Sequence, residues 1–304
     1  MATDPILVPF EISVARGRFA GLRLSDYWAI TKPEVNFLIA ITTAVGFYLG
    51  APMPLAWASL LNAVLGTVLV ASGAGALNQW MEHRFDANMR RTARRPVAAG
   101  RIAPIRALIF GAMLALAGIV YLFLTENRPT AFLAAVTLAS YLFLYTPAKR
   151  ITPLCTLIGA FPGAVPPLIG WAAARGSLAP QAWLLFAIVF LWQFPHFMAI
   201  AWMYREDYSR AGYLVLPAGD QRNHFVIWQT LLPASALLPL YLIPVATGVL
   251  GLANSAGALL VGAVFLYYAV RFAFRRSNVA ARQLLVASII YLPVAFALMS
   301  LDKR

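Results

Sequence analysis

Charged residues are so sparse in this chain that they divide it into long uncharged segments. A helix that crosses a membrane needs about 20 consecutive apolar residues, so each segment of that length predicts one crossing. Residues 35–81 and 223–270 are long enough for two helices each, with predicted turns at Gly50–Pro54 and Thr247–Ser255, where Gly and Pro gather. The other segments are residues 107–125, 129–148, 151–174, 176–204 and 283–301. The pattern therefore predicts nine membrane helices.

Composition supports a membrane protein. Hydrophobic residues make up 61% of the 304 residues and charged residues 12%, against about 45–50% and about 25% in a soluble domain. This excludes soluble globular and disordered classes, and a lone cysteine, Cys155, excludes an internal disulfide. Lipid leaves open backbone groups unsatisfied, and the period-2 alternation of a barrel is absent. The predicted fold is all-α: a polytopic bundle of about nine transmembrane helices.

Lys and Arg are distributed unequally over the predicted loops. If the N-terminus is cytoplasmic, 20 of them lie on that side and four on the other, as the positive-inside rule requires. Residues 1–30 lack the order of a cleavable signal and are predicted to be a cytoplasmic arm, with residues 31–304 forming one membrane domain. The net charge of +13 then indicates topology and anion binding rather than a nucleic-acid partner.

Acidic residues gather at two places on the predicted cytoplasmic side. After the second predicted helix, Asn78, Glu82 and Asp86 are spaced i, i+4 and i+8, which places them on one face of a helix. Hard oxygen ligands of this kind suit Mg²⁺, which takes one or two carboxylates together with substrate phosphates. Four arginines at helical or near-helical spacing follow, and guanidinium groups pair well with phosphate: Arg90, Arg91, Arg94 and Arg95. The acids and arginines together indicate a metal–diphosphate site; the alternative is a solvated topology anchor.

The second acidic place follows the sixth predicted helix. If that helix continues, His196 and Asp207 share a face, and Gln193 could point into the same cavity. A histidine inside a membrane helix is a functional candidate, although it could equally bond a neighbouring backbone group. Glu206 and Asp207 could likewise be a solvated loop end paired with nearby arginines. Lys149 and Arg150, at the end of the fourth predicted helix, are either a loop anchor or a further cationic arm for the phosphate.

These stretches resemble the UbiA superfamily of intramembrane prenyltransferases over nearly the whole chain. The matching motifs are Thr31-Lys32-Pro33-Glu34-Val35-Asn36, Asn78…Glu82…Asp86 with Met89-Arg90-Arg91-Thr92 and Arg95-Pro96, Tyr145-Thr146-Pro147 with Lys149-Arg150, and Trp192-Gln193-Phe194-Pro195-His196-Phe197 running to Asp207-Tyr208, Ala211-Gly212-Tyr213 and Leu216-Pro217. The resemblance implies a central cavity open to the membrane and Mg²⁺ as cofactor. It implies a first Asp-rich motif at Asn78, Glu82 and Asp86, and a second, here reduced to Glu206-Asp207.

Within the superfamily the resemblance is to members that farnesylate haem b. It implies farnesyl diphosphate and haem b as substrates, addition of water to give haem O, and a multi-pass chain in the bacterial inner membrane, where a haem A synthase or an oxidase assembly factor is a possible partner. Residues expected to bind and neutralise the diphosphate are Asn78, Glu82, Asp86, Arg90, Arg91, Arg94, Arg95, Lys149, Arg205 and Asp207. Expected metal ligands are Asn78, Glu82, Asp86, Glu206 and Asp207. Expected substrate contacts are Lys32, Asn36, Tyr145, Gln193 and His196.

Two further expectations concern the acceptor. Histidine is a plausible ligand of haem iron, so we hypothesise that His196 meets the iron. The alternatives left open are a prenyltransferase with a quinone-precursor acceptor, a secondary transporter and a non-catalytic haem-binding subunit. Against a transporter, the long uncharged segments place no acid, lysine or arginine at midplane depth.

Overall fold

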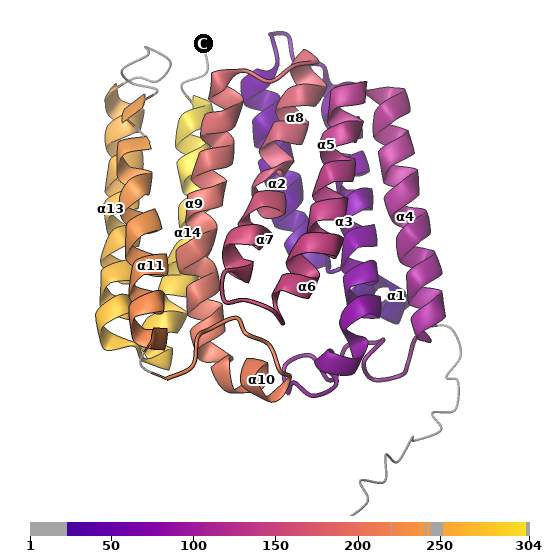
Figure 1. Cartoon of the computed structure of the whole chain (residues 1–304). Helices are drawn as coiled ribbons and strands as arrows, with labels where there is room; N and C mark the ends of the chain where they lie inside the picture. Colours follow the sequence, from indigo (N-terminus) through magenta and orange to yellow (C-terminus); the bar gives the residue numbers. More distant parts are fainter. Residues whose placement is uncertain (1–22, 220, 241, 244–251, 302–304) are drawn as a thin grey trace, which may run out of the picture.

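The computed structural model describes residues 23–301 except 220, 241 and 244–251 (Figure 1). In this part of the chain every regular element is a helix. The elements are α1 (Leu24–Ile30), α2 (Pro33–Gly50), α3 (Trp57–Asp86), α4 (Pro104–Thr125), α5 (Arg128–Ala139), η1 (Ser140–Tyr145), α6 (Thr146–Ala148), α7 (Cys155–Ala164), α8 (Pro166–Arg175), α9 (Pro180–Met203), α10 (Arg205–Arg210), α11 (Gln221–Leu240), α13 (Leu252–Arg275) and α14 (Asn278–Leu301).

The described elements form nine rods, as predicted. Eight are long and apolar enough to cross a membrane, counting α5, η1 and α6 as one rod and α7 with α8 as another. The ninth rod, α11, begins with the polar residues Gln221 to His224, which lower its mean hydropathy. The predicted turn at Gly50–Pro54 is confirmed between α2 and α3. The predicted turn at Thr247–Ser255 lies partly outside the described residues, and its last four residues already belong to α13.

Small residues allow these rods to pack closely. Where α3 crosses α4, a Cβ on Gly73 would lie 2.5 Å from the backbone nitrogen of Ala115, so only glycine fits. Where α2 crosses α8, Gly46 lies directly against the backbone of Pro167. In lipid there is little hydrophobic drive between helices, and such close backbone approach supplies the packing energy instead.

The two ends of the bundle differ. The lower end in Figure 1 carries α1, α6, α10 and the long loops after α3 and α10, whereas α14 ends at the opposite side. An odd number of crossings between α1 and the end of α14 agrees with the predicted topology. We call the lower end the rim.

Two helices at the rim end earlier than the helical spacing of their polar residues allowed. Residues 87–103 do not continue α3 as a helix but form successive turns, held in part by the Thr92 hydroxyl, which donates to the Asp86 carbonyl at 2.9 Å. Nor does α9 continue to Asp207: it ends at Met203, and Tyr204 separates it from the short helix α10. Of the predicted cytoplasmic arm, residues 1–22 lie outside the described residues.

Candidate active site

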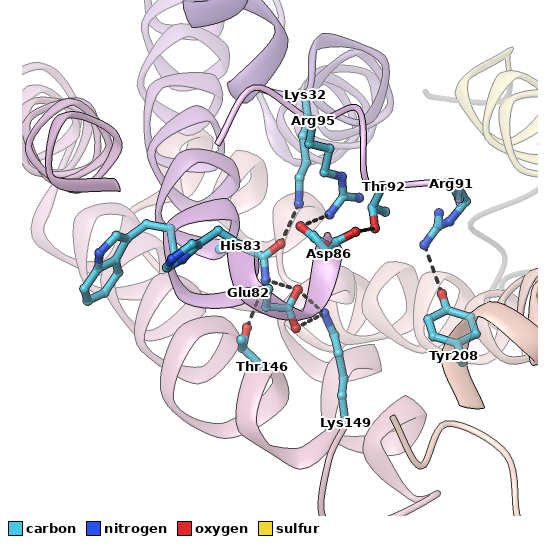
Figure 2. A network of polar contacts seen from close by, with 12 residues as sticks. Lys32, Glu82, His83, Asp86, Arg91, Thr92, Arg95, Thr146, Lys149 and Tyr208 are labelled. Carbon is cyan, nitrogen blue, oxygen red and sulfur yellow. Dashed lines mark hydrogen bonds and ion pairs between the residues drawn. The ribbon is translucent and has the colours of Figure 1, made fainter. Parts of the chain in front are cut away.

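The last two turns of α3 carry the first acidic motif, and its predicted single face is confirmed. Asn78, Glu82 and Asp86 are all buried, with 5% or less of their surface exposed. The Asn78 amide donates to Glu82 Oε2 at 2.8 Å, and also lies 3.3 Å from the Thr146 hydroxyl on α6. Figure 2 shows the carboxylates of Glu82 and Asp86 among cations from separate parts of the chain.

Buried carboxylates need partners, and each has one. Lys149, just after α6, donates to both Glu82 oxygens at 3.0 Å. Arg95, in the loop after α3, pairs with Asp86 Oδ2 at 2.8 Å. Lys32, between α1 and α2, donates to Asn78 Oδ1 at 2.8 Å. Four chain segments therefore converge on this motif, and Lys32, Lys149 and Arg95 are brought to it as predicted.

The pKa values of Lys32 and Lys149 shift in opposite directions. Burial and the neighbouring Arg95 and Lys149 charges lower the pKa of Lys32 to about 7. Burial also acts to lower the pKa of Lys149, but the charge and hydrogen bonds of Glu82 outweigh it, so the net shift is upward. Lys149 is thus the firmly charged partner of the motif, whereas Lys32 loses its proton near neutral pH.

Arg91 connects this motif to the second one. Its backbone N–H donates to Asp207 Oδ2 at 3.1 Å. Its guanidinium donates to the Tyr208 hydroxyl at 3.1 Å (Figure 2). The guanidinium also stacks over the Tyr204 ring, 4.9 Å from the centroid. The loop after α3 therefore contacts the second motif through Arg91, which is engaged there rather than free to bind phosphate; that the two motifs form one site stays a prediction.

The second motif is asymmetric. Asp207 is buried and pairs with Arg210 at 3.1 Å, whereas the Glu206 side chain is 79% exposed. A cavity of about 410 Å³ opens here, lined by Arg90, Arg91, Met203, Tyr204, Glu206 and Asp207. Arg90 and Arg94 are exposed and make no side-chain hydrogen bond or ion pair to any described residue. Both are available to an anion at the rim.

Arg205 reaches this cluster only through a 3.9 Å ion pair with Glu206. Its guanidinium donates to the Trp202 carbonyl at 2.8 Å and to Asn278 Oδ1 on α14 at 3.0 Å. Its expected place beside the diphosphate is therefore not observed.

The donor set suits a hard divalent ion that a substrate shares. Within the described part of the chain, no three His, Cys, Asp or Glu side chains stand close enough to hold a metal ion by themselves. Mg²⁺ does not need such a cage, because it takes one or two carboxylates and completes its shell with waters and phosphate oxygens. The oxygens of Asn78, Glu82 and Asp86 fit that requirement.

The remaining expected substrate contacts are engaged in helix packing. His196 Nδ1 lies 2.8 Å from the Ser288 hydroxyl of α14, and its ring stacks on Trp192. The Gln193 amide donates to the Ala160 carbonyl of α7 at 3.0 Å.

Two further expected contacts lie nearer the first motif. Asn36 donates to the Thr31 carbonyl and to Ser72 on α3, both at 2.8 Å. Of these two residues, Tyr145 is the one that contacts a charged group of the site: the Lys149 ammonium lies 4.6 Å from the centroid of its ring.

Sequence reasoning missed several polar residues that shape the site. Thr146 contacts Asn78, and Thr92 anchors the loop after α3. Both lie inside motifs quoted for the resemblance, so that signal was present. Ser288 had no such signal, because nothing in its sequence neighbourhood distinguishes it from other membrane serines.

Comparison with known proteins agrees with this geometry. Residues 39–297 match the model of the UbiA prenyltransferase family. A protein of Solibacter usitatus named protoheme IX farnesyltransferase is 47% identical, over 92% of this chain and 99% of its own length. A protein of the same name from Koribacter versatilis is 40% identical over 99% and 98%.

Solved structures share the fold. A digeranylgeranylglyceryl phosphate synthase superposes with a TM-score of 0.72 at 16% identity, covering 92% of this chain and 98% of that one. A UbiA homologue from Archaeoglobus fulgidus, bound to GPP and Mg²⁺, superposes with a TM-score of 0.65 at 12% identity, covering 90% and 99%. The chain belongs to the UbiA prenyltransferase family.

Proposed function

We propose that this protein transfers the farnesyl group of farnesyl diphosphate to a vinyl group of haem b, with addition of water, to give haem O and diphosphate. One observation carries the proposal: two acidic motifs, each with its own cations, meet at one rim of a membrane bundle. The near full-length relatives named protoheme IX farnesyltransferase support the choice of donor and acceptor. Family membership and the rim site together speak against a transporter.

The diphosphate headgroup binds at the rim, with the farnesyl tail between the helices. The oxygens of Asn78, Glu82, Asp86 and Asp207 would hold Mg²⁺ when it binds with the substrate. The ion would supply positive charge that stabilises the leaving diphosphate. A UbiA homologue of the same fold was solved with GPP and Mg²⁺, which supports Mg²⁺ as the ion that accompanies the diphosphate. Arg90 lines the cavity and Arg94 is exposed in the same loop, and Lys149 and Arg95 already lie at the carboxylates.

These residues lower the barrier by stabilising charge that develops on the leaving group. The bond between farnesyl C1 and the diphosphate oxygen breaks, leaving an allylic cation. The terminal vinyl carbon of haem b bonds to that C1, so the positive charge passes to the carbon next to the porphyrin. A water oxygen adds there and releases a proton. The half-buried ring of Tyr145, which lies against the Lys149 ammonium, helps to exclude other water and is a candidate to stabilise the allylic cation.

For the acceptor side we retain His196 as the proposed ligand of haem iron. Its Nε2 is the nitrogen not used by Ser288, so it is the atom that would meet the metal. Replacing His196 with Ala is expected to change the Soret band of bound haem; an unchanged spectrum together with unchanged turnover would remove this role.

We place residues 31–304 as one catalytic domain in the bacterial cytoplasmic membrane, with the rim on the cytoplasmic side. That side is favoured by the Lys and Arg asymmetry. An enzyme that consumes one haem and releases another needs a neighbour that accepts haem O, so a haem A synthase or an oxidase assembly factor is the partner we propose.

The test is direct reconstitution. Purified full-length protein, haem b, farnesyl diphosphate and Mg²⁺ should yield haem O by mass spectrometry, and chelation of Mg²⁺ should abolish it. Glu82→Gln and Asp86→Asn should abolish transfer, while Arg205→Gln, which alters a residue whose hydrogen bonds go to Trp202 and Asn278, should retain most of it. Prenylation of a quinone precursor in place of haem would overturn the choice of acceptor.

A further inference from the structure

The segment between α10 and α11 brings one more polar group into the first acidic motif. Tyr213 is 6% exposed, and its ring packs between Phe85 and Tyr208, with centroids 5.9 and 6.0 Å away. The backbone fixes its position. Its own N–H donates to the Tyr208 carbonyl at 2.9 Å, and the next N–H, that of Leu214, donates to the Lys149 carbonyl at 2.7 Å.

The Tyr213 hydroxyl is buried and has no hydrogen-bond partner in the described structure. Burial, then the Glu82 and Asp86 charges, and then a close approach to Glu82 that falls short of hydrogen-bond geometry raise the pKa of the phenol. No carboxylate oxygen in the described structure meets this hydroxyl with hydrogen-bond geometry. Both Glu82 oxygens accept from Lys149, and Asp86 Oδ2 accepts from Arg95.

A buried donor without an acceptor is costly and rare in native structures. The unused hydroxyl beside two carboxylates therefore calls for an acceptor that arrives with the substrate. A diphosphate bound to these carboxylates through Mg²⁺ brings several acceptor oxygens to that place. The Lys149 carbonyl anchor also ties the tyrosine to the segment that carries the motif's main cation.

We propose that the Tyr213 hydroxyl donates a hydrogen bond to the diphosphate of the prenyl donor and is a headgroup-binding residue. This deepens the proposed function and rests on it. The hydroxyl is satisfied only in the substrate complex, so it contributes to diphosphate affinity and not to the stability of the substrate-free protein.

The test compares Tyr213→Phe with wild type in the full-length protein. Its affinity for inorganic pyrophosphate with Mg²⁺, measured by calorimetry, should fall about tenfold, which corresponds to about 1.4 kcal/mol. The KM for farnesyl diphosphate should rise while the KM for haem stays the same. Without ligand, the variant should melt at or above the wild-type temperature, because it loses a buried donor that had no partner.

Tyr121→Phe is the matched control, since that hydroxyl donates to Asn62 at 2.7 Å, away from the motif. It should leave pyrophosphate affinity unchanged. Tyr213→Phe with wild-type pyrophosphate affinity, or with a lowered melting temperature in the absence of ligand, would overturn the proposal. Failure of the proposed function is separate: the wild-type protein would then bind pyrophosphate and yet form no haem O.

Discussion

The pair between Lys149 and Glu82 gives the sharpest test of the site's energetics. Its two N–O distances are 3.0 Å, and the side chains are 13% and 7% exposed. Removing one partner of such a pair leaves a buried charge uncompensated, which costs about 3–5 kcal/mol. Lys149→Met keeps the length and apolar stem of the side chain and removes only the charge. We therefore expect it to lower the unfolding free energy by about 3–5 kcal/mol.

The single cysteine provides the assay. Cys155 is buried at the start of α7, so a thiol-reactive fluorophore labels it only when the bundle opens. The melting temperature of Lys149→Met should fall by on the order of 10 °C. Arg210→Met is the matched control, because Arg210 is 43% exposed in its pair with Asp207 and an exposed pair contributes about 1 kcal/mol or less.

A double variant tests whether the uncompensated Glu82 carboxylate causes the loss of stability. Adding Glu82→Gln to Lys149→Met removes the uncompensated carboxylate, so most of the lost stability should return although transfer activity stays absent. If Lys149→Met melts at the wild-type temperature, or if the double variant is as unstable as the single one, the pair does not hold the rim together.

Three other results are expected. Arg91→Ala should make the loop after α3 more sensitive to proteinase K, because it loses the bond to Tyr208 and the stacking on Tyr204, whereas the exposed Arg90→Ala should be cut like wild type. Gly46→Ala should lower the melting temperature, because the added Cβ would overlap the backbone of α8 and reduce the unfolding free energy by about 1–3 kcal/mol. Gly257→Ala should be tolerated, because its Cβ would meet only a flexible leucine side chain at 3.3 Å. The raised pKa of Lys149 means that its stabilisation is complete below its unfolded value near 10.5 and is lost as pH rises through the higher folded value, so the difference between wild type and Lys149→Met should shrink only above about pH 10.5.

The helices and the first motif were predictable because they depend on local periodicity. Uncharged segments set the rods, and the spacing of Asn78, Glu82 and Asp86 fixes one helix face whatever the rest of the chain does. Lys149 and Arg95 were also found, since their residue types at a membrane edge suit a phosphate.

Features that depend on long-range packing were not predictable. Spacing alone could not tell that residues 87–103 leave the helix, because that follows from side-chain bonds such as that of Thr92. The same holds for Arg205, which turns to Asn278, more than 70 residues further along the chain. Tyr213 was visible only as part of a motif, and its place beside Glu82 is set by the fold.

The ion pairs of the rim bear on the order in which a metal ion and the prenyl donor would bind there. With Lys149 on Glu82 and Arg95 on Asp86, the resting carboxylates attract a free divalent cation only weakly, while Arg90 and Arg94 keep an excess of positive charge exposed at the rim. On the proposed function, a magnesium salt of the prenyl donor would meet both needs at once, because its anion would satisfy the cations and so free the carboxylates for its metal. Metal and prenyl donor would then bind as one species, and release of the diphosphate would let Lys149 and Arg95 pair with the carboxylates again.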